Sequence, residues 1–352
     1  MTKNKLPLVS IVIPLYGSLP YYKKCLDSVL KTRYPFIEVL LIDDLSVDGA
    51  PELINKQYKD KRLKLVRLKK KGYVSGARTE GAKLARGKYV AFLDHDVEVD
   101  KNWIAEHIKI LETDDNIGAT QGKILDFRKR KYLQTVAILL IKQLGWVIGY
   151  GLGQKDTGKF DNKKYSLAGA TNVVYRKSVF KKIGYFDQMF RFNVDDLDLA
   201  MRTWIAGYKT LTVPKAIIYH WTVKDWKRRG QSVERLFWEN EFVKIPIVLL
   251  KNYQTKYLCF YFPMALFFLL ARGIYRFFKG NYYPIYAYFR MLGWLIINSS
   301  TVLKKRKHIQ DKVRKIDDLS WFNKVAYSLN IFEVLDKVVF PLRRRIKINL
   351  EK

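Results

Sequence analysis

Three short groups of aspartates stand out as side chains that could do chemistry. Asp94 and Asp96 are two positions apart and directly follow the apolar run Tyr89–Leu93. Two carboxylates at this spacing after a strand can converge on one hard cation, because Mg²⁺ and Mn²⁺ prefer oxygen ligands and share them with substrate phosphates. Such a cation offsets the charge that develops on a departing diphosphate. An isolated Asp-x-Asp is also common in turns, so the pair needs support from the rest of the chain.

The other two acidic groups are Asp43-Asp44 and Asp195-Asp196-Leu-Asp198. A carboxylate after the apolar run Ile37–Ile42 could accept hydrogen bonds from a nucleobase N–H or from ribose hydroxyls, although this stretch also has the composition of a turn. In the later group, a carboxylate could take the proton from an attacking hydroxyl as a general base. Acidic residues also begin helices, and a helical pattern does follow. His220 follows an expected strand, where a lone histidine is more often structural than ligating.

The elements that would position these side chains alternate between strand and helix. Strands are expected at Val9–Ile13, Ile37–Ile42, Leu63–Leu68 and Tyr89–Leu93, with helices from about residue 18 and over about 75–85. This alternation predicts an α/β fold with a mainly parallel sheet and crossover helices. Ligands bind beyond the carboxyl ends of such strands. The first two acidic groups fall at those ends.

The middle of the chain predicts two more strands and, before them, an element that is either buried or faces the acceptor substrate of a transfer reaction. Residues 132–153 are mainly apolar, but the polar residues Gln134, Lys142 and Gln143 interrupt the run. A membrane span needs about 20 mainly apolar residues, so this stretch is not expected to cross a membrane. Short strands are expected at Leu211–Pro214 and Ala216–Tyr219, ending just before His220.

The net charge of +32 indicates a phosphate-rich partner, either nucleic acid or an anionic membrane. Between Phe242 and Gln310 there is no Asp or Glu, but there are eleven Lys or Arg and seventeen aromatic residues. Nucleic-acid binders also mix such residues. Here the aromatics stand in apolar blocks such as Tyr257–Ala271, which suit lipid better, so no nucleic-acid partner is expected.

The apolar segments of the tail, 245–250, 257–271 and 285–297, are interrupted by Pro246, Pro263 and Arg290. None has the length of a comfortable span, which favours interfacial or re-entrant helices held by flanking cations at the membrane surface. The alternative is an ordinary helical subdomain that covers the sheet. Two cysteines and the absence of a signal-peptide pattern at the N-terminus fit a reducing, cytoplasmic setting.

Taken in order, these residues resemble family 2 glycosyltransferases of GT-A fold, over roughly residues 8 to 221. Within the family the pattern is most similar to rhamnosyltransferase-like enzymes of surface polysaccharide or lipid-linked glycan assembly. The stretches that carry the resemblance are Val9-Ser-Ile-Val-Ile-Pro14-Leu-Tyr16, Asp43-Asp44, Gly76-Ala-Arg78, Phe92-Leu-Asp94-His-Asp96, Gly184-Tyr-Phe-Asp187, Asp195-Asp196-Leu-Asp198 and His220.

The resemblance implies a role for each matching residue. The residues implied to bind the nucleotide are Pro14, Tyr16, Asp44, Gly76, Arg78 and Asp94. Asp94 and Asp96 would form a DXD motif for Mg²⁺ or Mn²⁺, with Asp96 the stronger ligand and His220 a further one. Asp196 would be the catalytic base, with Asp195 as the alternative because the family often has Glu there. Thr79 stands where the family often has Asn, which leaves the donor contacts at that position open.

The expected function is an inverting, metal-dependent transfer of one sugar from a nucleotide-diphosphate sugar to a glycan or lipid-linked acceptor. Such a transfer would serve polysaccharide biosynthesis or protein glycosylation at the cytoplasmic face of the membrane. The Gln-x-x-Arg-Trp motif of processive synthases is absent, because Gln231, Arg235 and Trp238 have other spacings.

The expected organisation is a catalytic domain over 1–223, followed by a basic, aromatic-rich, helical membrane-associating region over 224–352. The nucleotide-binding half would cover about 1–97 and the acceptor half about 98–223. One alternative is a basic nucleic-acid- or membrane-binding protein with a degenerate transferase domain, but intact carboxylate groups repel phosphate unless a metal intervenes. Another is a nucleotidyltransferase, which would have a Gly-rich basic loop where Pro14-Leu-Tyr-Gly-Ser18 stands.

Overall fold

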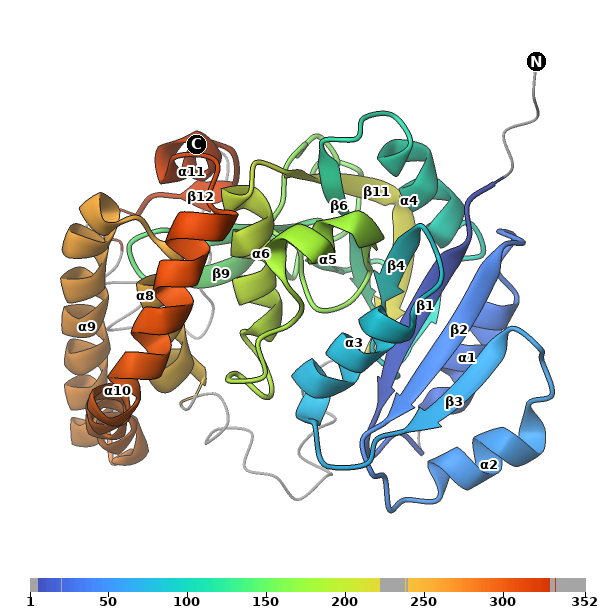
Figure 1. The fold of residues 1–352 in the computed structure, drawn as a ribbon, viewed down its shortest axis with the longest axis horizontal. Helices are drawn as coiled ribbons and strands as arrows, with labels where there is room; N and C mark the ends of the chain where they lie inside the picture. Colours follow the sequence, from blue (N-terminus) through green and yellow to red (C-terminus); the bar gives the residue numbers. More distant parts are fainter. Residues whose placement is uncertain (1–5, 20, 222–237, 239, 330–332, 334–352) are drawn as a thin grey trace. The chain divides into compact units, whose positions relative to one another are not determined.

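The computed structural model of the chain describes residues 6–19, 21–221, 238, 240–329 and 333 (Figure 1). The chain divides into two compact units: residues 1–138 with 151–222, and residues 139–150 with 223–352. The expected domain boundary at 223/224 and the stretch containing Gln231 and Arg235 lie outside the described residues.

The first unit is built on a sheet with the strand order β3-β2-β1-β4-β10-β6-β11-β5, with β7 beside β6. The strands β3, β2, β1 and β4 run parallel to one another, and so do β6 and β11. Strand β10 is antiparallel to both of its neighbours, and β5 is antiparallel to β11. The strands are β1 (Val9–Leu15), β2 (Ile37–Asp43), β3 (Leu63–Arg67), β4 (Tyr89–Phe92), β5 (Val97–Val99), β6 (Ile117–Asp126), β7 (Leu133–Thr135), β10 (Val173–Arg176) and β11 (Lys209–His220). The predicted α/β class with a mainly parallel sheet is confirmed.

Helices cover both faces of this sheet. They are α1 (Tyr22–Leu30), α2 (Ala50–Gln57), α3 (Tyr73–Leu84), α4 (Trp103–Leu111), α5 (Lys177–Ile183) and α6 (Asp195–Ile205). The odd-numbered residues of β1 pack into one core with α1, α2 and α4. Val12 points to the other face, where a Cβ on Gly81 of α3 would overlap its side chain. The missing side chain at Gly81 therefore lets α3 lie directly on the strand.

Two sequence expectations for the middle of the chain need correction or completion. The strands expected at Leu211–Pro214 and Ala216–Tyr219 form one strand, β11, because the register against β6 shifts between Val213 and Ile217. Proline is tolerated in a strand at such an irregularity, so Pro214 does not end it. Residues 132–153 form β7 and two further strands, β8 (Ala137–Ile141) and β9 (Trp146–Tyr150), and most of their side chains are buried.

The second unit is mainly helical. Its elements are two π-helical turns (Asn240–Lys244 and Ile309–Val313), α8 (Ile245–Asn252), α9 (Thr255–Phe278), α10 (Tyr283–His308), α11 (Asp318–Val325) and β12 (Ala326–Tyr327). Helices α9 and α10 lie against each other (Figure 1). Strand β12 adds to β8, which pairs in turn with β9, to make a small separate sheet.

The expectation that no tail segment has the length of a membrane span was wrong. Helix α9 runs for 24 residues through Pro263 and contains an 18-residue stretch with a mean hydropathy of 1.7, so it is long and apolar enough to cross a membrane. A proline inside a helix removes one hydrogen bond, at a cost of about 3 kcal/mol, and this helix continues in spite of it. Pro246 stands in the first turn of α8, where the missing N–H has no helical partner anyway. A core helix passes the same test of length and composition, so α9 alone does not establish a span.

Candidate active site

The carboxyl ends of β1, β2 and β4 lie side by side because these strands are parallel neighbours. Tyr16, Asp44 and Asp94 follow the three strands at this edge. The backbone N–H of Asp44 donates to the carbonyl of Leu15 at 3.0 Å, which ties the end of β2 to the end of β1. The sheet therefore brings the first two acidic groups to one edge, as the strand pattern predicted.

Asp94, Asp96 and His220 form a candidate cation site within the described residues. One ligand atom from each lies within 4.8 Å of the others. His220 Nε2 and Asp96 Oδ1 are 3.4 Å apart, close to the spacing of about 3 Å between neighbouring ligands of an octahedral ion held at about 2.1 Å. The two carboxylates suit Mn²⁺ or Mg²⁺, and the imidazole can add a third ligand. The residues present fit such an ion.

The backbone fixes how these ligands meet. Asp96 precedes β5, and His220 is the last residue of β11, which pairs with β5. The N–H of Trp221 donates to the carbonyl of Asp96 at 3.2 Å. Burial disfavours the charged form of His220, but its hydrogen bond to Asp96 and the charge of that carboxylate outweigh this and raise the pKa of the imidazole.

Arg78 joins the candidate cation site to the start of α6. Its two terminal nitrogens donate to Asp195 Oδ2 and to Asp94 Oδ1, each at 3.0 Å. Both Arg78 and Asp195 are buried. Burial opposes the charge on the guanidinium, but Asp195 and then Asp94 raise the pKa of Arg78 above its ordinary value. The resemblance implied a nucleotide contact for Arg78, whereas here its terminal nitrogens hold two carboxylates.

The three aspartates of α6 have different environments. Asp198 is buried and pairs with Arg202 at 2.9 Å, which is a structural role within the helix. Burial raises the pKa of Asp195, and the charge of Arg78 counteracts that rise. Asp196 is partly exposed, and burial together with the neighbouring charge of Asp195 raises its pKa to about 6. Asp196 is thus the carboxylate of α6 that combines exposure with a basicity near neutral pH.

The turn before α6 holds an unfavourable backbone. Arg191, Asn193 and Val194 all have positive φ, with Val194 at 68°. A β-branched residue in the left-handed region is rare and costs about 1–2 kcal/mol. The carbonyl of Arg191 accepts a hydrogen bond from the N–H of Ser75 at 3.0 Å, which ties this turn to the first turn of α3. Strain of this kind collects where side chains must be held in place for function.

A second group gathers around Asp44. Its Oδ1 accepts the N–H of Gly72 at 2.7 Å, and Lys71 Nζ lies 3.2 Å from its Oδ2. The same ammonium lies 3.1 Å from the ring centre of Tyr16, a residue that is 48% exposed. A Cβ on Gly76, in the first turns of α3, would meet no atom within 4 Å, so the backbone there faces open space.

Pro14 lies inside β1 and is buried, and its carbonyl lies 3.2 Å from His95 Nδ1. Three polar residues that contact the site were not singled out as site residues from the sequence. They are Lys71, Thr171, whose hydroxyl accepts the N–H of Asp94 at 3.1 Å, and Gln134, which contacts His220. Gln134 did leave a signal, as a polar residue in an apolar stretch. Lys71 follows two other lysines, and nothing in the sequence distinguishes it from them.

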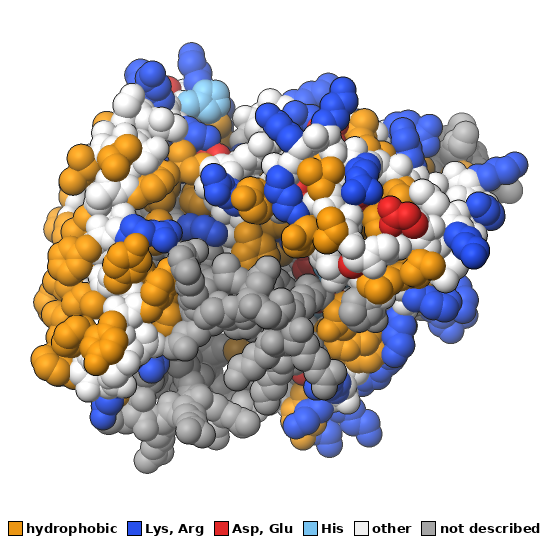
Figure 2. Space-filling model, turned by 90° about the horizontal axis from the view of Figure 1, so that it is seen from below, with side chains coloured by type: hydrophobic (Ala, Val, Ile, Leu, Met, Phe, Trp, Pro, Cys, Tyr) orange, Lys and Arg blue, Asp and Glu red, His pale blue; other side chains and the backbone are white. Residues whose placement is uncertain are grey.

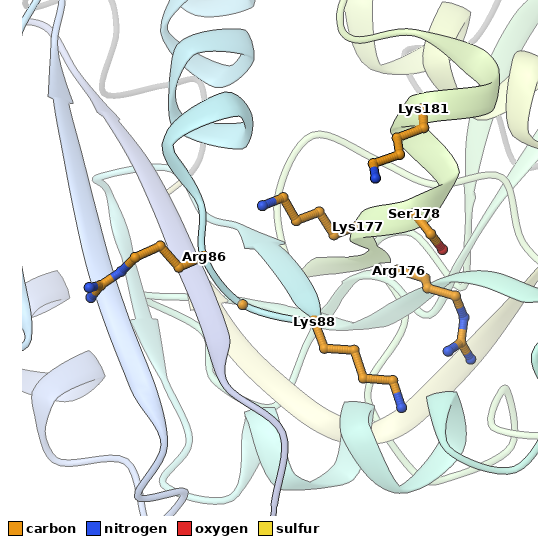
Figure 3. Close-up of a pocket in the computed structure, with 7 residues that line it drawn as sticks. Arg86, Lys88, Arg176, Lys177, Ser178 and Lys181 are labelled. Carbon is orange, nitrogen blue, oxygen red and sulfur yellow. The ribbon is translucent and has the colours of Figure 1, made fainter.

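A separate basic pocket lies at the start of β4, the opposite end of that strand from Asp94. The residues that line it, shown in Figure 3, are Arg86, Gly87, Lys88, Arg176, Lys177, Ser178 and Lys181. Arg86 pairs with Glu38, Lys88 with Glu112 and Arg176 with Asp115, so much of its positive charge is neutralised. This pocket does not belong to the carboxylate site.

With its mainly parallel sheet and helices on both faces, the chain has the GT-A fold of glycosyltransferases. Residues 10–184 match the model of glycosyl transferase family 2, and through this domain the chain belongs to that family.

Three similar proteins illustrate the relationship. The putative teichuronic acid biosynthesis glycosyltransferase TuaG of Bacillus subtilis is 32% identical over 109 residues, which are 31% of this chain and 43% of that protein. The first 349 residues of S. aureus TarS, solved with UDP-GlcNAc, have 18% identity and a TM-score of 0.57, covering 87% of this chain and 88% of theirs. The mannosyltransferase PcManGT of Pyrobaculum calidifontis, solved with GDP-Man and Mn²⁺, has 16% identity and a TM-score of 0.54, covering 87% and 86%. At such identities the two structures support the fold alone.

The stretches that match the first curated relatives cover between 21% and 43% of the lengths of those proteins. The relatives therefore establish the kind of domain, and the activity of the whole chain is a separate question.

Proposed function

We propose that the protein is an inverting, metal-dependent glycosyltransferase that moves one sugar from a nucleotide-diphosphate sugar to a glycan or lipid-linked acceptor. One observation carries this proposal. Asp94, Asp96 and His220 have ligand atoms within 4.8 Å of one another, and Arg78 connects this group to the carboxylates of α6. A family 2 domain with that arrangement has the parts that sugar transfer from a diphosphate requires.

The nucleotide half of the domain would span about residues 1–97. Asp44 and Tyr16 would contact the base and ribose, and Pro14 would shape the pocket from within β1. Lys71 lies over Tyr16 and beside Asp44, so it is an added candidate for contact with the nucleotide. The open space beside Gly76 gives a phosphate room to approach the first turn of α3. The nucleotide sugars bound by TarS and PcManGT support this class of donor.

Asp94, Asp96 and His220 would hold the divalent cation, Mn²⁺ or Mg²⁺. When bound, such an ion offsets the negative charge that develops on the leaving diphosphate. Arg78 adds a buried positive charge next to Asp94 and keeps that carboxylate oriented. The Mn²⁺ in the PcManGT structure supports the choice of metal class.

Asp196 would act as the general base on the acceptor side, in the half of the domain over about 98–223. It would accept the proton of the acceptor hydroxyl as that oxygen forms a bond to the anomeric carbon. The bond from that carbon to the diphosphate oxygen breaks, and the diphosphate leaves with the electron pair. Attack from the face opposite the leaving group inverts the configuration. Asp195, fully buried and paired with Arg78, would position Asp196 rather than take the proton.

The proposed location is the cytoplasmic face of a membrane. Exposed apolar side chains lie along α9 and α10, and Figure 2 shows hydrophobic side chains gathered over these helices. The most exposed are Phe260, Phe267, Phe278, Phe289, Ile296 and Ile297 on the helices, and Tyr282 in the turn between them. An exposed apolar surface on two helices that carry cations and no Asp or Glu of their own suits an anionic lipid surface. The teichuronic acid relative supports an acceptor in surface polysaccharide assembly.

The test is a screen of UDP-, GDP- and dTDP-sugars for Mn²⁺-dependent release of the nucleoside diphosphate. We expect turnover of at least one donor, loss of turnover with EDTA, and recovery with Mn²⁺. Asp96→Asn should reduce turnover at least 100-fold. Asp115→Asn, which changes a carboxylate that is 95% exposed and pairs with Arg176, should leave it unchanged. Turnover that persists in EDTA or in Asp96→Asn would refute the proposed role of the metal.

A further inference from the structure

The contacts of His220 with Gln134 fix which imidazole nitrogen faces the cation site. Gln134 lies on β7, and its Nε2 donates to the backbone carbonyl of His220 at 2.7 Å. Its Oε1 lies 2.8 Å from Nδ1 of the same histidine. One amide side chain therefore contacts both the backbone and the ring of one residue.

The backbone carbonyl determines the orientation of this amide. A carbonyl can only accept a hydrogen bond, so the group of Gln134 that faces it must be the NH₂. The oxygen of the amide then faces Nδ1, and it can only accept. Nδ1 must carry the hydrogen, which leaves the lone pair of neutral His220 on Nε2. That nitrogen is the one 3.4 Å from Asp96.

We infer that Gln134 is a positioning residue that holds His220 in the Nδ1–H tautomer, so that Nε2 is available to a divalent cation. Metal-binding histidines generally donate their other ring N–H to an acceptor, and loss of that acceptor costs about 10–100-fold in metal affinity. The inference rests on the proposed function, because it assigns Gln134 to the same cation site. Gln134, on β7, would act through His220 and would not itself be a ligand of the cation.

Strand pairing fixes the backbone of Gln134 next to the end of β11. Strand β7 pairs with β6, and β6 pairs with β11, the strand that ends at His220. The N–H of Phe127, just after β6, also donates to the carbonyl of His220 at 3.0 Å. The end of β11 is thus fixed from two sides, so a change of the Gln134 side chain should alter the ring of His220 more than its backbone.

Two variants separate the acceptor from the shape of the side chain. Gln134→Met keeps the length of the side chain but removes the acceptor for Nδ1–H. Gln134→Glu keeps an acceptor at that point. Mn²⁺ binding to the purified protein, followed by the electron paramagnetic resonance signal of free Mn²⁺, should weaken at least tenfold in Gln134→Met and stay within threefold of the wild type in Gln134→Glu. In turnover assays the loss in Gln134→Met should appear as a higher Mn²⁺ requirement, with kcat recovered at saturating metal.

The tautomer itself is visible by NMR. The chain has only four histidines, so ¹⁵N-histidine labelling gives few signals, and His220→Gln assigns the one of interest. In metal-free protein above the pKa of His220, the wild type and Gln134→Glu should show the Nδ1–H form, and Gln134→Met should show a mixture of both forms. Unchanged Mn²⁺ affinity in Gln134→Met, equal loss in both variants, or an Nε2–H tautomer in the wild type would overturn the inference. A wild type that binds no Mn²⁺ would instead refute the metal site of the proposed function.

Discussion

Asp196 has the two properties that the proposed reaction needs from a base: it is partly exposed, and its pKa is raised to about 6 by burial and by the charge of Asp195. A base works in its deprotonated form, so transfer should be constant above about pH 7 and fall as pH decreases through 6. Asp196→Asn should lower kcat about 10²–10⁴-fold, while the donor dissociation constant changes less than threefold. Rates from pH 4.5 to 8 and calorimetric donor binding measure both. Full activity at pH 5, or transfer by Asp196→Asn at wild-type rates, would exclude Asp196 as the base.

Arg78 is the residue whose loss should disturb the site most through charge. Asp195 is fully buried and Arg78 is its ion-pair partner. Removing one member of a buried pair leaves an uncompensated charge and costs about 3–5 kcal/mol. Urea unfolding of Arg78→Met at pH 7 should show a loss of that size. Lys23→Met breaks an exposed pair with Asp27 and should cost less than about 1 kcal/mol. Equal losses in the two variants would mean that the Arg78 pair adds nothing to stability beyond a surface contact.

At the scale of elements, helix α4 is attached to the sheet through a buried histidine. His107 Nδ1 lies 2.9 Å from the hydroxyl of Thr120 on β6, and its Nε2 lies 3.1 Å from Oδ1 of Asn172. Asn172 in turn donates to the carbonyls of Lys123 and Ala216. The network therefore joins a helix and two strands around a ring that must stay neutral.

Burial lowers the pKa of His107 to about 4, against 6.5 for an ordinary histidine. Between these values the unfolded chain binds a proton that the folded protein does not bind, so stability increases with pH. The contribution of neutral, buried His107 to the free energy of unfolding is complete above pH 6.5 and is lost as the pH falls toward 4. Between pH 6.5 and 5 the loss should be about 2 kcal/mol. Urea unfolding of the wild type and of His107→Gln at both pH values measures it. The variant should show a smaller decrease between the two, and equal decreases would show that His107 is not the group responsible.

The sequence predicted those elements whose local pattern agrees with their final environment. β1, β2 and β4 are short apolar runs, the first two rich in β-branched residues, and the aspartates after β2 and β4 could be placed at one sheet edge. The pattern did not indicate that β11 continues past Pro214 or that α9 continues past Pro263, because a proline's local preference is outweighed by pairing or packing that the sequence does not display. Gln134 and Lys71 were missed for a related reason. Their roles depend on contacts with His220 and Asp44 across the fold.

At the scale of the whole molecule, the proposed partner is an anionic membrane. The net charge of +32 and the exposed apolar side chains of α9 and α10 would both favour binding to it. Charge brings the protein to an anionic surface, and each cation close to it contributes about 1 kcal/mol that salt can screen. Burial of the apolar side chains in the membrane contributes binding free energy that salt does not screen. Binding that depends on both should therefore weaken, but persist, as the ionic strength increases.

Vesicle flotation separates the two contributions. We expect binding to phosphatidylglycerol vesicles at 0.1 M salt, weaker binding at 0.5 M, and little binding to phosphatidylcholine alone, on the physical grounds of charge screening. Phe267→Glu with Phe289→Glu places two carboxylates on exposed positions of α9 and α10, which are 61% and 60% exposed, and should lower binding at least tenfold. Leu19→Glu with Val47→Glu adds the same charge at exposed positions of the first unit and should lower it less than threefold. If both pairs of changes weakened binding equally, net charge alone would explain attachment, and the apolar face of α9 and α10 would need another partner.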